Sequence, residues 1–300
     1  MSRVVITHVG TSALKCAAIK RGDTRPSDYE QKVQEISGSE ERAGPRLPGW
    51  LEALLPEWQQ ALREGLCAVW NDARRDVNWK RNQSPAEIAS LTMMSLQRGD
   101  RVVLVSSDTN AGQFCASMLH HGLATVPAGT CDARAFRPDD LEVPEVVVLP
   151  GVETKDGSRF VAEGLPQYMR LVAAERNRMH AERDTLHFNI TGGYKGIIPF
   201  AVLAAQLLGT HPYHRLSTEV VYWHAASSAT LISLGPHLPM DWEKMKALHQ
   251  GICTLVEHPG SDLARELDER WNPYRLTTSE SHPNALALTV YHLLNDLGWV

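Results

Sequence analysis

Short blocks of Val, Ile and Leu alternate along the chain with stretches in which apolar residues recur every three or four positions. The blocks predict six strands, at 4–8, 102–106, 146–149, 186–190, 219–223 and 230–234. Several blocks are continuously apolar, which is typical of strands covered on both faces of a parallel sheet. Because helical patterns lie between them, the sequence predicts an α/β fold with a mostly parallel sheet and flanking helices.

The longest helical pattern runs from residue 47 to about residue 78, and Pro56 is expected to mark a break or a helix start within it. A second helix is predicted to begin at Ser84. In this interpretation Ser84 is the N-cap, Pro85 takes the first helical position, and Glu87 completes a capping box three residues after the cap.

The spacing of these elements suggests two parts. About ninety residues separate the first two strands, whereas a plain crossover needs about a dozen, so a helical insertion is expected at about residues 45–98. The chain after residue 240 shows only helical patterns, at 241–256, 261–270 and 284–297. We therefore expect a ligand-binding domain over residues 1–240 and a C-terminal helical appendage over residues 241–300.

Composition narrows the classes of function. The 300 residues carry a formal net charge of −5, so no global basic field for long nucleic acid is expected. The sequence has no run of 18 apolar residues, so no membrane span is expected. The first residues lead directly into a strand pattern and are too few for a signal peptide, so none is expected. Its five cysteines are scattered without a Cys-x-x-Cys motif, which favours reduced thiols and a cytoplasmic protein.

The most informative segment follows the strand at 186–190. This strand ends in Thr191-Gly192-Gly193-Tyr194-Lys195, and an apolar helix pattern begins at once. A strand, glycine turn and helix in succession direct backbone N–H groups and a positive helix terminus at an anion, and paired glycines allow close approach. Neither a Walker A loop nor a Gly-x-Gly-x-x-Gly fingerprint is present, so the expected phosphate is not that of ATP or NAD.

Two other strands end in polar turns of small residues. Each turn alone has a simple structural explanation as a helix N-cap. At the carboxyl edge of one parallel sheet, however, the three turns together predict a polar rim suited to phosphates or nucleotides. The residues of the two further turns are Gly10, Thr11 and Ser12 after the first strand, and Ser107, Asp108, Thr109 and Gln113 after the second.

These turns, with the helix start at 84–88 and the ending Leu-Ile-Ser-Leu-Gly-Pro-His-Leu-Pro at 231–239, resemble the CRISPR-associated Rossmann-fold (CARF) proteins. Those proteins are the cyclic oligoadenylate sensors of type III CRISPR systems. The resemblance covers roughly residues 1–240 and implies a Rossmann-like sheet. It also implies a homodimer. The ring-shaped cyclic oligoadenylate, most often cyclic tetra-adenylate, would lie across the two-fold axis of this dimer.

The resemblance also implies roles for the candidate residues. The first turn would contact one phosphodiester and its ribose, the second would line the base and ribose pocket, and the third would hold the phosphates. The implied ligand-binding residues are Gly10, Thr11, Ser107, Asp108, Thr109, Gln113, Thr191, Gly192, Gly193 and Tyr194, and the implied catalytic residues are Lys195 and Ser12.

The C-terminal region bears on catalysis. After residue 240 the chain lacks both the Arg-x-x-x-x-His spacing of HEPN ribonucleases and the acidic pattern of restriction-like nucleases. This favours a ring nuclease, which cleaves the messenger without a metal or cofactor. In that reaction the ribose 2′-OH attacks its own 3′-phosphodiester and leaves linear products with a 2′,3′-cyclic phosphate. Lys195 would stabilise the transition state and Ser12 would position the ribose.

Other interpretations stay open or are disfavoured by the sequence. A non-catalytic cyclic oligoadenylate receptor that signals through a partner is the main alternative. An enzyme for a small phosphorylated metabolite lacks visible paired carboxylates, and a winged helix is disfavoured by the acidic tail. The histidines at 120–121 and 211–214 lack a third ligand, so no zinc site is expected. His8 is interpreted as a satisfied core or rim histidine.

Overall fold

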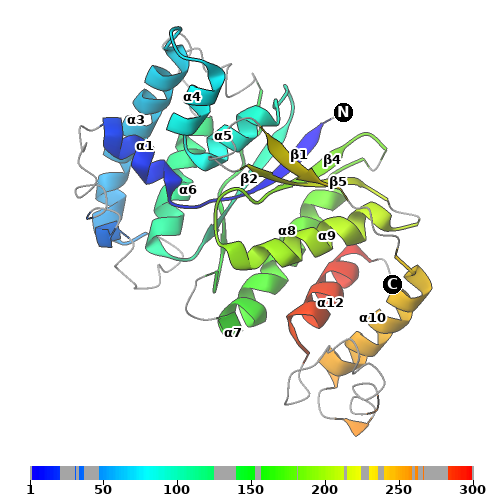
Figure 1. The fold of residues 1–300 in the computed structure, drawn as a ribbon. Coiled ribbons are helices and arrows are strands. Elements are labelled where there is room, and N and C mark those ends of the chain that lie inside the picture. The colour runs from blue at the N-terminus through cyan, green and yellow to red at the C-terminus, as the bar shows by residue number, and fades with distance from the viewer. Residues whose placement is uncertain are drawn as a thin grey trace.

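The computed structural model has a central sheet with helices on both of its faces (Figure 1). It describes residues 2–20, 31, 34–36, 47–124, 140–152, 157–180, 182–212, 215–223, 230–235, 240–258, 261–262, 266 and 283–298. In these ranges no helix is long and apolar enough to cross a membrane.

The six predicted strands are confirmed and form one sheet. Its order is β3-β2-β1-β4-β5-β6; all neighbours are parallel except β6, which pairs antiparallel with β5. The α/β class and the mostly parallel sheet are therefore confirmed. The strands are β1 (Arg3–His8), β2 (Arg101–Ser107), β3 (Val147–Leu149), β4 (Thr185–Asn189), β5 (Ser217–Trp223) and β6 (Leu231–Leu234).

The strand order reverses beside β1. From β1 the chain adds β2 and then β3 on one side, whereas β4, β5 and β6 follow on the other side. In open α/β sheets, ligands bind beyond the carboxyl ends of the strands at such a reversal. The ends of β1 and β4 therefore mark the place where a site is expected.

One face of the sheet is covered by the helices between β1 and β3. Val5, Val102 and Leu104 point to this side and pack with buried side chains that include Trp58 and Phe114, whose rings meet edge to face. The helices are α1 (Ser12–Lys20), α3 (Gly49–Asn71), α4 (Val77–Gln83), α5 (Ala86–Met93) and α6 (Asn110–Ala124).

The predicted start of α5 and the predicted break at Pro56 are both wrong. Helix α3 continues through Pro56 without a break. Ser84 is not the N-cap of α5, because its hydroxyl donates to the carbonyl of Lys80 and accepts from the indole N–H of Trp70. The backbone N–H of Ala86 instead donates to the hydroxyl of Ser12, 3.0 Å away. The start of α5 is thus capped by a residue from the distant turn after β1 and not by a neighbouring residue in the sequence.

The opposite face carries the remaining helices. Ile6, Val103 and Phe188 point to this side and share one core with Tyr168 and Leu293. The elements here are α7 (Gly157–Arg159), a π-helical turn (Phe160–Gly164), α8 (Leu165–Asn177), a 3₁₀ turn (Lys195–Ile197), α9 (Ile198–Thr210), α10 (Trp242–Glu257) and α12 (Ala285–Leu297).

The C-terminal helices begin as the sequence predicts. The side chains of Asp241 and Asn284 cap α10 and α12 by accepting the backbone N–H groups of Lys244 and Ala287. Helix α12 packs against α8, and α10 packs against α12 (Figure 1). The helix predicted at 261–270 lies almost wholly outside the described residues, and the division at residue 240 stays a prediction.

Candidate functional site

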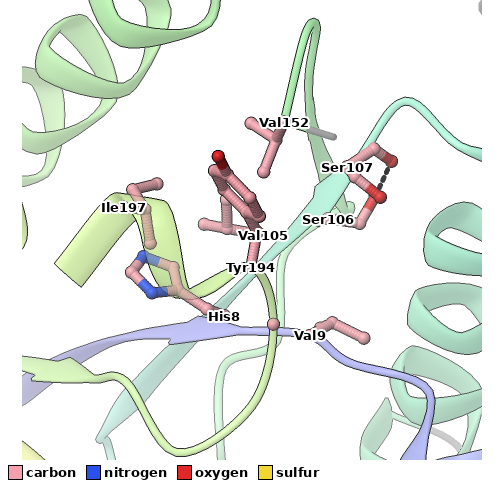
Figure 2. Close-up of a pocket in the computed structure, with 9 residues that line it drawn as sticks. His8, Val9, Val105, Ser106, Ser107, Val152, Tyr194 and Ile197 are labelled. Carbon is pink, nitrogen blue, oxygen red and sulfur yellow. Dashed lines mark hydrogen bonds between the residues drawn. The ribbon is translucent and has the colours of Figure 1, made fainter. Parts of the chain in front are cut away.

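Three polar turns lie at the carboxyl edge of the sheet, and the turns after β2 and β4 border a small pocket. Figure 2 shows its lining, which comes from the ends of β1 and β2, from Val152 after β3, and from the turn after β4. The space between its walls is about 200 Å³ when the part that opens to solvent is included. Its lining residues are His8, Val9, Val105, Ser106, Ser107, Val152, Gly193, Tyr194 and Ile197. The structure thus brings Ser107, Gly193 and Tyr194 of the predicted set together.

The glycines of the turn after β4 are required by close packing against β1 and α5. Gly193 has φ +74°, in the left-handed region that favours glycine. A Cβ on Gly193 would lie 2.8 Å from the Cβ of His8, and one on Gly192 would lie 2.1 Å from Oε1 of Glu87. The hydroxyl of Thr191 accepts the backbone N–H of Trp223 at 3.0 Å. These residues hold the turn tightly against β1, α5 and the end of β5.

Lys195 folds back over the end of β4. Its Nζ donates to the carbonyl oxygens of Thr191, Ile190 and Gly192, at 2.8, 3.3 and 3.5 Å, and lies 5.7 Å from the centroid of the Tyr222 ring. Partial burial lowers the pKa of Lys195, while the nearby carboxylate of Glu87 opposes this shift. A phosphate that approached Lys195 would have to exchange with these carbonyl contacts.

The turn after β1 is built around the carboxylate of Glu87. Oε1 of Glu87 accepts the backbone N–H of Gly10 at 2.7 Å, and Oε2 accepts the hydroxyl of Ser12 at 2.5 Å. Glu87 is only 1% exposed, whereas Ser12 is half-buried and Thr11 is exposed. A carboxylate thus lies at the start of α1, where the helix terminus favours an anion.

This role of Glu87 has no local signature in the sequence. Ser12 and Glu87 lie 75 positions apart, so no local pattern connects them. The available signal was a carboxylate in the first turn of a helix, and that signal was interpreted as a local cap. Gly10 shows how tight the junction is, because a Cβ there would lie 2.9 Å from the backbone nitrogen of Gly193.

The turn after β2 has one residue that faces the pocket. The hydroxyls of Ser107 and Thr109 lie 2.7 Å apart, and that of Thr109 accepts the backbone N–H of Gly112 near the start of α6. Ser107 lines the pocket, whereas Thr109 has the N-cap role that any such turn can supply. Gln113 lies buried on α6, outside the pocket lining.

Asp108 ties this turn to the neighbouring segment. Its carboxylate is buried, pairs with the guanidinium of Arg159 at 2.7 Å and accepts the backbone N–H of Gly151 at 3.2 Å. Asp108 therefore holds the segment that carries Val152, a wall of the pocket.

His8 is a buried residue of the pocket. Its Nε2 lies 3.2 Å from the hydroxyl of Tyr168, and its Nδ1 has no hydrogen-bond partner among the described residues. Burial lowers the pKa of His8 to about 3, and the positive charge of Lys195 adds to this shift. Burial also raises the pKa of the Tyr168 phenol. The imidazole is therefore neutral near pH 7.

The described residues contain no cluster of three or more His, Cys, Asp or Glu side chains that could hold a metal ion. The polar groups that the structure describes at this edge include Lys195, Ser12 with Glu87, the backbone N–H groups of the turns, and the neutral His8.

Comparison with known proteins places the chain in a family. No curated protein matches the sequence. The CRISPR-associated protein family Cas_APE2256 matches residues 81–234, which make up 154 of the 300 residues and run from α4 to the end of β6. The matched stretch includes Glu87, Ser107 and the turn at 191–195, while β1 lies before it. Because the match covers more than half of the chain, this protein belongs to the Cas_APE2256 family of CRISPR-associated proteins.

Proposed function

We propose that this protein binds cyclic oligoadenylate, with cyclic tetra-adenylate as the first candidate, at a homodimer interface and cleaves it to linear products. Such an activity would switch off type III CRISPR signalling. Membership of a CRISPR-associated family supports the biological setting. The CARF-like turns over residues 1–240 supply the choice of ligand.

One observation carries the proposal. The three polar turns lie at the carboxyl edge of the sheet, beside the reversal of strand order, and the ends of β1 and β2 and the turn after β4 border a pocket with aromatic, apolar and hydroxyl-bearing walls. Ligands of α/β proteins bind at this edge of the sheet. The pocket is small, so we expect it to receive only part of the ligand, with Tyr194 and Ser107 at its walls.

The proposed chemistry needs no metal. The ribose 2′-OH attacks the adjacent phosphorus, the bond to the 5′-oxygen breaks, and a 2′,3′-cyclic phosphate remains. Because the nucleophile belongs to the substrate, the protein contributes mainly in-line geometry and stabilisation of the charged transition state. Lys195 would provide the charge after leaving its carbonyl contacts, and Ser12 would position the attacking ribose.

The test is to incubate the purified protein with rings of four and six adenylates in the presence of EDTA. We expect linear products that end in a 2′,3′-cyclic phosphate, identified by mass spectrometry, and a dimeric mass by light scattering. A protein that neither binds nor cleaves either ring, or that stays monomeric with the ring bound, would overturn the proposal.

A receptor that binds the ring without cleaving it is the second candidate. It is favoured by one observation: both proposed catalytic groups already have partners, Lys195 on three carbonyls and Ser12 on Glu87 and Ala86. Tight binding of an intact ring over several hours in the same assay would identify the receptor.

A further inference from the structure

Glu87 joins two of the three turns from a buried position. One carboxylate oxygen accepts the N–H of Gly10, and the other accepts the hydroxyl of Ser12. The same Oε1 lies against Gly192, where any Cβ would collide with it. Glu87 also acts electrostatically on Lys195. This single side chain therefore contacts or influences each part of the proposed catalytic edge except the turn after β2.

The contacts of Ser12 limit what its hydroxyl can do. A serine hydroxyl has one proton to donate and two lone pairs with which to accept. The proton of Ser12 is committed to Glu87, and one lone pair takes the N–H of Ala86. One lone pair remains on a half-buried residue. Ser12 can therefore accept a hydrogen bond from a ligand but cannot donate one while Glu87 holds its proton.

We propose that Glu87 is a positioning residue that makes Ser12 the proton acceptor for the attacking ribose hydroxyl. The inference rests on the proposed function. In this step the 2′-OH gives its proton to Oγ of Ser12 as Ser12 passes its own proton to Oε2 of Glu87. The 2′-oxygen bonds to phosphorus, the bond from phosphorus to the 5′-oxygen breaks, and that oxygen takes a proton from water. Glu87 then returns the proton through Ser12 to water.

The substitution Glu87→Gln tests the step with little change in shape. The amide oxygen of Gln can still accept the N–H of Gly10, but its NH₂ group then faces Ser12 and donates to the hydroxyl. Both lone pairs of Ser12 are then occupied, so towards a ligand its hydroxyl can donate a hydrogen bond but no longer accept one. We expect kcat for ring cleavage to fall by roughly 100-fold or more, the usual contribution of a general base. Ring affinity should change by less than about threefold, because the loss belongs to the transition state.

The pH profile gives a readout that a purely structural role would not move. The pH dependence of the rate should differ between the wild type and the Gln variant, because only the wild type has an ionisable side chain at this position. Glu87→Asp, which keeps a carboxylate, should restore part of the rate and the wild-type pH dependence. Glu175→Gln is the matched control, since Glu175 is equally buried but pairs with Arg101 away from the site.

A double-mutant cycle completes the experiment. Because Glu87 acts through Ser12, the Ser12→Ala, Glu87→Gln double variant should be no slower than Ser12→Ala alone. Should Glu87→Gln fail to fold, as judged by circular dichroism, Ser12→Ala provides the test: it keeps the carboxylate of Glu87 in place, and its rate must lose the pH dependence of the wild type.

The outcomes separate the two proposals. A wild-type protein that leaves the ring intact refutes cleavage and this inference together. A wild-type protein that cleaves, with a Glu87→Gln variant of unchanged rate and pH profile, leaves the proposed function standing and overturns the role of Glu87. A double variant that is clearly slower than Ser12→Ala has the same meaning.

Discussion

The buried imidazole of His8 makes the fold sensitive to acid. Its side chain is 3% exposed, and burial holds its pKa at about 3 instead of 6.5. Between these two values the unfolded chain binds a proton at His8 and the folded chain does not. Stability from this residue is therefore complete above about pH 6.5 and is lost progressively as the pH falls towards 3.

The size of the effect follows from the shift. A pH of 5 lies about 1.5 units below the ordinary imidazole pKa of the unfolded chain, and each unit is worth roughly 1.4 kcal/mol. Protonation of His8 in the unfolded chain should therefore lower the free energy of unfolding by about 2 kcal/mol relative to neutral pH. His8→Gln removes the titration while its amide can still contact the hydroxyl of Tyr168. The variant should therefore lose about 2 kcal/mol less than the wild type between pH 7 and pH 5.

Urea unfolding followed by circular dichroism at pH 7 and pH 5 measures this difference. His258→Gln is the control, because the exposed side chain of His258 meets water in the folded chain as in the unfolded chain. The reasoning is refuted if His8→Gln loses as much stability on acidification as the wild type, or if His258→Gln gives the same protection.

Three further predictions concern the turns. Gly192→Ala should cost more than about 2 kcal/mol in urea unfolding, because its Cβ would lie 2.1 Å from a buried carboxylate oxygen, whereas Gly49→Ala, with no atom within 4 Å, should be nearly neutral. Asp108→Asn should lower the free energy of unfolding by about 1–3 kcal/mol by breaking the partly buried pair with Arg159, and an unchanged urea midpoint would contradict this. Lys195→Ala should slow ring cleavage more than it weakens ring binding, as single-turnover rates and calorimetry can show; equal losses would mark a binding residue only.

The strands and the starts of two C-terminal helices could be predicted because their signals are local. A buried parallel strand must be apolar on both faces, as the blocks at β1 and β2 are, and successive residues such as Val5 and Ile6 pack into opposite cores. The caps at Asp241 and Asn284 depend on a side chain and an N–H three residues later. Each of these features can be found within a short window of sequence.

The partners at the site could not be predicted because they come from distant segments. Ser84 has the local pattern of an N-cap, yet Ser12 supplies the oxygen that the start of α5 needs. The glycines at 192 and 193 suggested space for a ligand, but the structure fills that space with Glu87 and His8. A sequence pattern shows that a turn needs a residue without a Cβ. It does not show which atom occupies the space.

The position of β1 determines which fragments of this protein can fold. The family match begins at residue 81, yet β2 and β4 each pair with β1 rather than with each other. A polypeptide trimmed to 81–234 would carry two unsatisfied hydrogen-bonding edges and would lack Val5 and Ile6, which fill both cores with no exposed surface. The N-terminal strand β1 thus joins the two halves of the sheet through its hydrogen bonds to β2 and β4. Expression of the matched stretch alone should therefore yield aggregated protein.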